Sequence, residues 1–138
     1  MRDILDEMIQ LNKSISEDKR KLQAINTTMY DLKGKNQDLS GVHASRRDAY
    51  LNVDKTIDTK EILKNRIKDN SKSLDILKKD LINNLKSIND DLMIDIMYLR
   101  YIDFFTWSSI CKILNYSRSR IFQKHNHCIY LLNKNKKD

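Results

Sequence analysis

Apolar residues recur at heptad spacing over much of the first 88 residues, a pattern typical of long α-helices. The stripe is two residues wide per seven, as in a coiled-coil seam and unlike the broader face of a globular core helix. Two such seams predict two helices that fold back as an antiparallel coiled-coil hairpin over residues 1–88. The first seam comprises Ile4, Met8, Leu11, Ile15, Leu22, Ile25, Met29, Leu32 and Leu39, and the second comprises Leu63, Ile67, Leu74, Leu77, Leu81 and Ile88.

Polar residues interrupt both seams. In coiled coils, such residues fix the register at a cost in stability; the alternative is that they occupy frayed or solvated ends. Between the seams, residues 34–45 are rich in Gly, Asn, Asp, Ser and Lys, which predicts a loop. We expect the second helix to begin between residues 45 and 55 and to run to about Ile88. The interrupting residues are Asp18, Asn36, Asn70 and Asn84.

The last third of the chain contains three shorter helical patterns. We expect a lead-in helix over residues 90–101, a second helix from Thr106 to Leu114, and a third from Arg118. Two short helices joined by a tight turn are typical of a helix-turn-helix, whose last helix lies in the DNA major groove. The sequence therefore predicts an all-α protein, with a helix-turn-helix domain over residues 89–138 behind the hairpin.

The predicted turn has suitable residues at each step. Asn115 follows the second helix, and asparagine is the non-glycine residue that best adopts left-handed backbone. Ser117 supplies an N-cap oxygen to the third helix. On the second helix, Ile110, Ile113 and Leu114 form the apolar stripe that we expect to pack in a small core, together with Trp107, Phe105, Phe122 and Tyr116.

At 100° per residue, the third helix separates an apolar side from a polar side. The apolar side contains Ile121, His125, Cys128, Leu131 and Leu132, and the polar side contains Ser119, Arg120, Gln123, Asn126, His127 and Tyr130. Gln and Asn can pair bidentately with adenine, and Arg with guanine or phosphate. The base-reading residues that we expect are Ser117, Arg118, Ser119, Phe122, Gln123 and Asn126. The phosphate-binding residues that we expect are Lys112, Arg120, Lys124, Tyr130 and Lys134.

The net charge of +7 is concentrated near the carboxyl end. Residues 99–138 carry eight basic and two acidic side chains, and no acidic residue lies between Thr106 and Lys137. A basic tail that serves solubility would explain the last lysines, but not the basic residues within the two helices. Coincidence of this charge with the predicted helix-turn-helix favours binding to the phosphates of double-stranded DNA.

Other classes of function find little support in the composition. The chain has no proline and two glycines, and a third of its residues are charged, which favours an almost wholly helical protein. No nucleophile–base pair, paired carboxylates or metal-ligand spacing is present, so we expect neither an enzyme nor a bound metal or cofactor. No apolar run is long enough to span a bilayer and no signal peptide opens the chain, so we expect a cytoplasmic protein without membrane contact.

The order LRYID, TWSSICKIL, NYSRSR and IFQKH from Leu99 to His125 resembles region 4 of sigma factors, which reads the −35 promoter element. It is more similar to small phage- and prophage-encoded regulators of late transcription that carry such a domain behind a helical hairpin. The similarity extends to DLSGV at Asp38–Val42 and to the pair Asp48–Ala49. Asn115 departs from the usual glycine, Lys124 from the usual apolar residue and Cys111 from the usual alanine. The resemblance implies sequence-specific control of phage gene transcription in the bacterial cytoplasm, at the nucleoid. It also makes RNA polymerase an expected partner.

One reading helix covers few base pairs, and we therefore expect a homodimer that pairs through the hairpins and reads two half-sites. Two alternatives stay open. A small terminase subunit would bind packaging-site DNA and form ring-sized oligomers. A helical module that captures a host protein would have no specific DNA complex.

Overall fold

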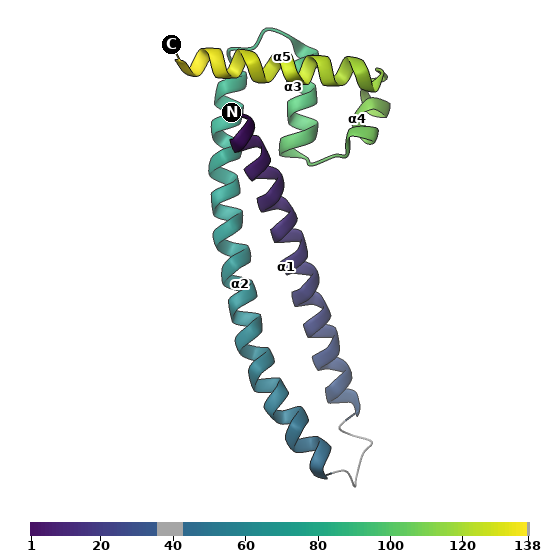
Figure 1. Cartoon of the computed structure of the whole chain (residues 1–138). Helices are drawn as coiled ribbons and strands as arrows, with labels where there is room; N and C mark the ends of the chain where they lie inside the picture. The colour runs from purple at the N-terminus through teal and green to yellow at the C-terminus, as the bar shows by residue number, and fades with distance from the viewer. Residues whose placement is uncertain (36–42, 138) are drawn as a thin grey trace. The chain divides into compact units, whose positions relative to one another are not determined.

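The computed structural model describes residues 1–35 and 43–137, with side chains for residues 1–29 and 58–135. Within this part of the chain all regular elements are helical, which confirms the predicted all-α class (Figure 1). The elements are α1 (Arg2–Lys35), α2 (His43–Leu85), α3 (Asp91–Met97), a π-helical turn η1 (Tyr98–Ile102), α4 (Trp107–Leu114) and α5 (Arg118–Lys137).

The chain divides into two compact units. We call residues 1–12 and 72–138 the terminal unit, and residues 13–71 the middle unit. The terminal unit combines the first turns of α1, the last turns of α2 and all the shorter helices. This division differs from the expected one, in which a hairpin domain ends at residue 88. The boundary at residue 88 stays a prediction.

The two long helices extend closer to each other in the sequence than the composition indicates. α1 continues through Gly34 to Lys35, and α2 begins at His43, before the start expected between residues 45 and 55. Of the loop expected over residues 34–45, residues 36–42 lie outside the described residues, as do two expected seam positions, Asn36 and Leu39. Glycine lowers helix stability by only about 1 kcal/mol, which the rest of a long helix offsets.

α2 ends at Leu85, three residues before the expected end at Ile88. The next three backbone N–H groups donate to carbonyls three residues earlier, with Ile88 N to Leu85 O at 3.0 Å. Such i→i+3 bonds tighten the last turn of a helix and satisfy carbonyl groups that the helix leaves free. The apolar side chain of Ile88 is nevertheless buried, as the seam pattern predicts.

In the middle unit, Asp18, which interrupts the first seam, forms a buried ion pair and does not lie at a solvated end of the seam. Asp18 is only 2% exposed, and its carboxylate accepts hydrogen bonds from Arg66 Nε at 3.1 Å and from Arg66 Nη2. The hydrogen bond to this carboxylate raises the pKa of Arg66 above its ordinary value. A charge in the seam is therefore neutralised by the neighbouring helix, with the seam residues Ile15 and Leu63 buried in the same unit.

Candidate nucleic-acid interface

The segment that leads to the basic helices begins with a capped helix. Asp90 Oδ1 accepts a hydrogen bond from the backbone N–H of Met93 at 3.1 Å, which satisfies one of the free donors at the start of α3. The predicted helix over residues 90–101 is wrong in one respect, because α3 ends at Met97. The chain then forms the π-helical turn η1, closed by an i→i+5 bond from Asp103 N to Tyr98 O of 3.0 Å.

The turn after η1 has an unusual backbone. Phe104 has a φ of 58°, a left-handed value that is rare for a bulky residue. Two hydrogen bonds hold this turn, from Phe105 N to Leu99 O at 2.8 Å and from Arg100 Nη1 to Phe105 O at 3.0 Å. Lys78 Nζ also lies 5.0 Å from the centre of the Phe104 ring. These contacts fix the direction in which the chain enters α4, and the sequence carried no signal for them.

The next two helices both begin with a side-chain cap, and the cap predicted at Ser117 is confirmed. Thr106 Oγ1 accepts the backbone N–H three residues later at 3.2 Å, at the start of α4. Asn115 ends α4 with left-handed φ and ψ of 59° and 45°, as predicted. Ser117 Oγ accepts the backbone N–H of Arg120 at 3.2 Å, at the start of α5. The three-residue connection between α4 and α5, residues 115–117, is therefore fixed by local hydrogen bonds.

A small apolar core holds α3, α4 and α5 together. Its centre consists of three isoleucines, one from each helix, which are fully buried: Ile96, Ile110 and Ile121. Half-buried side chains surround this centre, namely Leu92, Leu99, Trp107, Cys111 and Leu114. Cys111, the small residue of this shell, packs against the three isoleucines.

Three residues expected in this core are exposed instead. Ile113 is 54% exposed, and Phe105 and Tyr116 are also largely accessible. The packed side of α4 runs along Ile110 and Leu114, which are four residues apart. At 100° per residue, Ile113 lies to one side of that line, on an exposed side of the helix.

α5 has the two sides that its sequence predicts. All six residues expected on the polar side are exposed: Ser119, Arg120, Gln123, Asn126, His127 and Tyr130. The buried residues are Ile121, His125, Cys128, Ile129 and Leu132. Ile129 was not expected among them, and Leu131, which was, is only half-buried. The polar side of α5 is therefore accessible to a partner.

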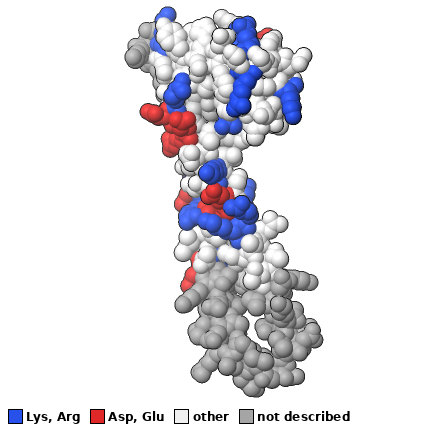
Figure 2. Space-filling model, turned by 45° about the vertical axis from the view of Figure 1, so that its right-hand side comes forward, with Lys and Arg blue, Asp and Glu red and all other residues white. Residues whose placement is uncertain are grey.

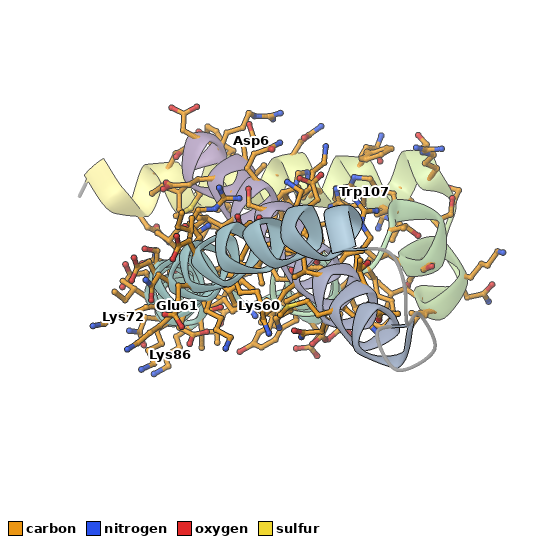
Figure 3. The ribbon with its side chains drawn as sticks, turned by 90° about the horizontal axis from the view of Figure 1, so that it is seen from below. Asp6, Lys60, Glu61, Lys72, Lys86 and Trp107 are labelled. Carbon is orange, nitrogen blue, oxygen red and sulfur yellow. The ribbon has the colours of Figure 1, made fainter. Side chains whose placement is uncertain are left out.

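Three residues one turn apart on α5 form what we call the reading row: Arg118, Phe122 and Asn126. The Arg118 guanidinium lies 5.4 Å from the centre of the Phe122 ring. Phe122 also contacts Trp107 of α4, with ring centres 4.9 Å apart. Trp107 is labelled in Figure 3. Phe122 therefore supports Arg118 as part of a half-buried aromatic pair, although the sequence placed it among the base-reading residues.

One of the lysines expected to bind phosphate is paired within the protein. Lys124 Nζ lies 2.7 Å from Asp90 Oδ2, and both side chains are mostly covered. The hydrogen bond from Lys124, with that from the Met93 backbone, lowers the pKa of Asp90 below its ordinary value. The ammonium of Lys124 thus joins α5 to the start of α3, and its charge is not free for DNA in this state.

The other residues expected to bind phosphate are exposed: Lys112, Arg120, Tyr130 and Lys134. Figure 2 shows basic side chains on one face of the terminal unit, separated by broad uncharged areas. Positive charge on this face is therefore distributed as single side chains and not as one continuous patch. Such spacing suits contacts with separate phosphates along a duplex.

Beneath the polar side of α5, a buried hydrogen bond joins two residues far apart in the sequence. Tyr101 Oη lies 2.6 Å from His125 Nε2, and Trp107 packs edge-on against the His125 ring. Burial lowers the pKa of His125 and raises the pKa of Tyr101 to about 12. Sequence reasoning placed His125 on the inner side of α5 but missed its partner, because no local pattern relates it to Tyr101.

A second long-range contact brings the other end of the chain to the reading row. Arg2 Nη2 at the start of α1 donates to Asn126 Oδ1 at a distance of 3.3 Å. Both residues belong to the terminal unit and both are exposed. The heptad pattern placed Arg2 on no functional surface, and nothing in the sequence relates it to residue 126.

Both cysteines are free thiols. Cys111 is half-buried and Cys128 is fully buried, and burial raises the pKa of Cys128 to about 11. Among the described residues, no group of three or more His, Cys, Asp or Glu side chains is arranged to hold a metal ion. Within the same residues, no helix is both long and apolar enough to cross a membrane.

Comparison with known proteins identified no relative of this chain. No protein-family model, no curated protein and no solved structure matches this chain. Its function must therefore be inferred from its own residues and geometry.

Proposed function

We propose that this protein is a sequence-specific regulator that binds double-stranded DNA. In this proposal α4, the turn at Asn115 and α5 form a helix-turn-helix, and the first turns of α5 enter the major groove. Ser117, Arg118, Ser119, Gln123 and Asn126 would face the base edges, and Phe122 would support Arg118 from behind.

The observation that carries the proposal is the accessible polar side of α5. Its amide and hydroxyl groups project from a helix whose opposite side is anchored by Ile121 and Leu132 in the core. Base recognition needs such groups on a rigid element, because the hydrogen-bonding pattern in the major groove is geometrically fixed. The exposed basic residues nearby, Lys112, Arg120 and Lys134, would bind phosphates on either side of the groove.

The sequence resemblance to sigma region 4 supports the same proposal and narrows it. It favours a regulator of phage or prophage transcription that works in the bacterial cytoplasm, at the nucleoid. Contact with RNA polymerase would follow from the same resemblance. The exposed Ile113 and Tyr116, next to the proposed reading helix, are apolar side chains available for such a protein contact.

We further propose that the protein acts as a homodimer that pairs through its long helices. On α2, Ile62 of the middle unit is 57% exposed and Ile76 of the terminal unit is 56% exposed. A large aliphatic residue that remains exposed on a helix with a heptad pattern is typical of a helix that lacks a partner. Light scattering of the intact chain tests this point, because Ile76→Asp should convert a dimer into a monomer. Ring-sized assemblies would instead favour a small terminase subunit.

The DNA proposal is tested by selecting duplexes from a random library with the intact chain and measuring affinity for the enriched and scrambled sequences. Gln123→Ala should weaken binding to the selected duplex by about 1–3 kcal/mol with little effect on the scrambled one. Lys134→Ala should weaken both duplexes and lower the slope of log affinity against log salt by about 1.

A matched control is Gln10→Ala, which removes an exposed glutamine from α1. It should leave both affinities unchanged. Equal losses on both duplexes from Gln123→Ala and Lys134→Ala would contradict the roles given to these residues. No enrichment at low salt would refute DNA reading itself and would favour a module that captures a host protein.

A further inference from the structure

The first turn of α1 reaches Asn126, the last residue of the reading row. Arg2 Nη2 donates to Asn126 Oδ1 at 3.3 Å, across 124 residues of sequence. The turn that carries Arg2 is well anchored, because Leu5 and Met8 of the same helix are buried. Asn126 is equally anchored, since it follows the buried His125 on α5. Two exposed side chains on firmly held backbones therefore meet at a defined place.

The chemistry of this contact determines how the amide of Asn126 is oriented. A guanidinium has donors and no acceptor, so the atom that faces it must be the amide oxygen and not the amide nitrogen. The NH₂ group of Asn126 then points away from Arg2. The side chain of Asn126 also forms a hydrogen bond with His125, so two neighbouring side chains hold this amide in one orientation.

This arrangement matches what adenine requires. In the major groove, adenine N7 accepts a hydrogen bond and adenine N6 donates one, so an asparagine reads it with NH₂ and oxygen together. An unrestrained amide can present its two ends in either order. With Arg2 in place, Asn126 presents one order before DNA arrives, which lowers the entropy lost when the base contact forms.

We propose that Arg2 is a positioning residue for base recognition, which orients the amide of Asn126 to read adenine. This inference rests on the proposed function and adds the first turn of α1 to the reading apparatus. The long helix would thus do more than present the DNA-binding helices, because its first turn shapes their specificity.

A double-mutant cycle on the intact chain tests the proposal. The probes are the duplex enriched from a random library and its single-base variants at the A·T pair that responds to Asn126→Ala. Arg2→Ala should reduce discrimination at that pair about threefold to tenfold, the range of one hydrogen bond. In the Asn126→Ala background, Arg2→Ala should cause no further loss of discrimination.

Two controls separate positioning from simple charge. Arg20→Ala removes another exposed arginine from α1 and should leave discrimination unchanged. The side-chain NH₂ resonance of Asn126, assigned by its absence in Asn126→Ala, should shift in Arg2→Ala without DNA. A melting temperature close to that of the unchanged protein would verify that Arg2→Ala is folded.

Three results would overturn the inference. Arg2→Ala could weaken the selected duplex and its variants equally and lower the salt slope by about 1, which would make Arg2 a phosphate contact. Discrimination could also stay unchanged, or fall by the same factor with and without Asn126. A library selection without enrichment is a distinct outcome, because it refutes the proposed function and removes the inference with it.

Discussion

The two units of this protein bury their polar groups in different ways. In the middle unit, the charged Asp18 is buried and is matched by Arg66, whose side chain remains 54% exposed. In the terminal unit, the buried pair of His125 and Tyr101 is neutral and is enclosed by Trp107. The exposed Arg66 can therefore balance a buried charge in the middle unit, whereas the enclosed pair in the terminal unit carries no charge to balance.

The units also differ in what ends their helices. Each junction from α3 to α5 has a side-chain cap or a left-handed residue, with Asp90, Thr106, Asn115 and Ser117 in these positions. Local capping defines short helices, which are marginal by themselves, while long helices draw their stability from continuous packing. The small core should therefore be sensitive to single cavities, and the middle unit to the loss of the partner of Asp18.

The largest effect should come from the core of the terminal unit. Ile110→Ala removes a fully buried side chain from the centre of three isoleucines and should lower the free energy of unfolding by about 3 kcal/mol. Urea unfolding followed by circular dichroism measures this loss. Ile113→Ala on the same helix is the matched control and should change the free energy of unfolding by less than about 0.5 kcal/mol, because Ile113 is exposed. Equal losses would show that the two residues share one environment.

A smaller effect on the melting temperature should come from the pair of Asp18 and Arg66 in the middle unit, and it should differ between the two partners. Arg66→Ala leaves the buried Asp18 carboxylate without its partner and should lower the melting temperature. Asp18→Leu replaces the charge with a seam residue and leaves Arg66 solvated, so the melting temperature should stay the same or rise. Differential scanning calorimetry of the two variants measures the contrast. The comparison between units fails if Asp18→Leu destabilises the protein as much as Arg66→Ala.

The smallest effect is the pH dependence of the terminal unit. Because the pKa of His125 is lower in the folded protein than its ordinary value of 6.5, the unfolded chain binds a proton first as pH falls. Stability should therefore be full above about pH 6.5 and decline toward the lower pKa of the folded state. Asp90, also lowered, adds a similar loss below its ordinary value of 3.8. Urea titrations from pH 8 to pH 5 should show a slope that His125→Phe reduces, and an unchanged slope in that variant would contradict this assignment.

The burial of Tyr101 and Cys128 should affect stability in the opposite direction, with a loss at high pH. Their pKa values are raised to about 12 and about 11, so stability should decline as pH rises above their ordinary values of 10 and 9. The terminal unit is therefore most stable at intermediate pH, where His125, Tyr101 and Cys128 are all neutral.

Sequence alone determined the features that depend on neighbours within four residues. The cap at Ser117, the left-handed Asn115 and the accessible side of α5 were all predictable, because a side-chain oxygen, a backbone preference and a helical period act locally. The heptad seams likewise predicted part of what α1 and α2 bury, with Met8, Ile15 and Leu63 among the buried residues. They missed Leu5 and Leu85, which are also buried.

Only the tertiary structure decided which distant residues meet. It pairs Arg2 with Asn126, Tyr101 with His125, Lys124 with Asp90 and Arg66 with Asp18, and it leaves Ile113 exposed despite its apolar character. A periodic pattern assigns a residue to a side of its helix but does not say which helix, if any, covers that side. That depends on the path of the whole chain, so the inferred role of Arg2 in base reading could not have come from the sequence.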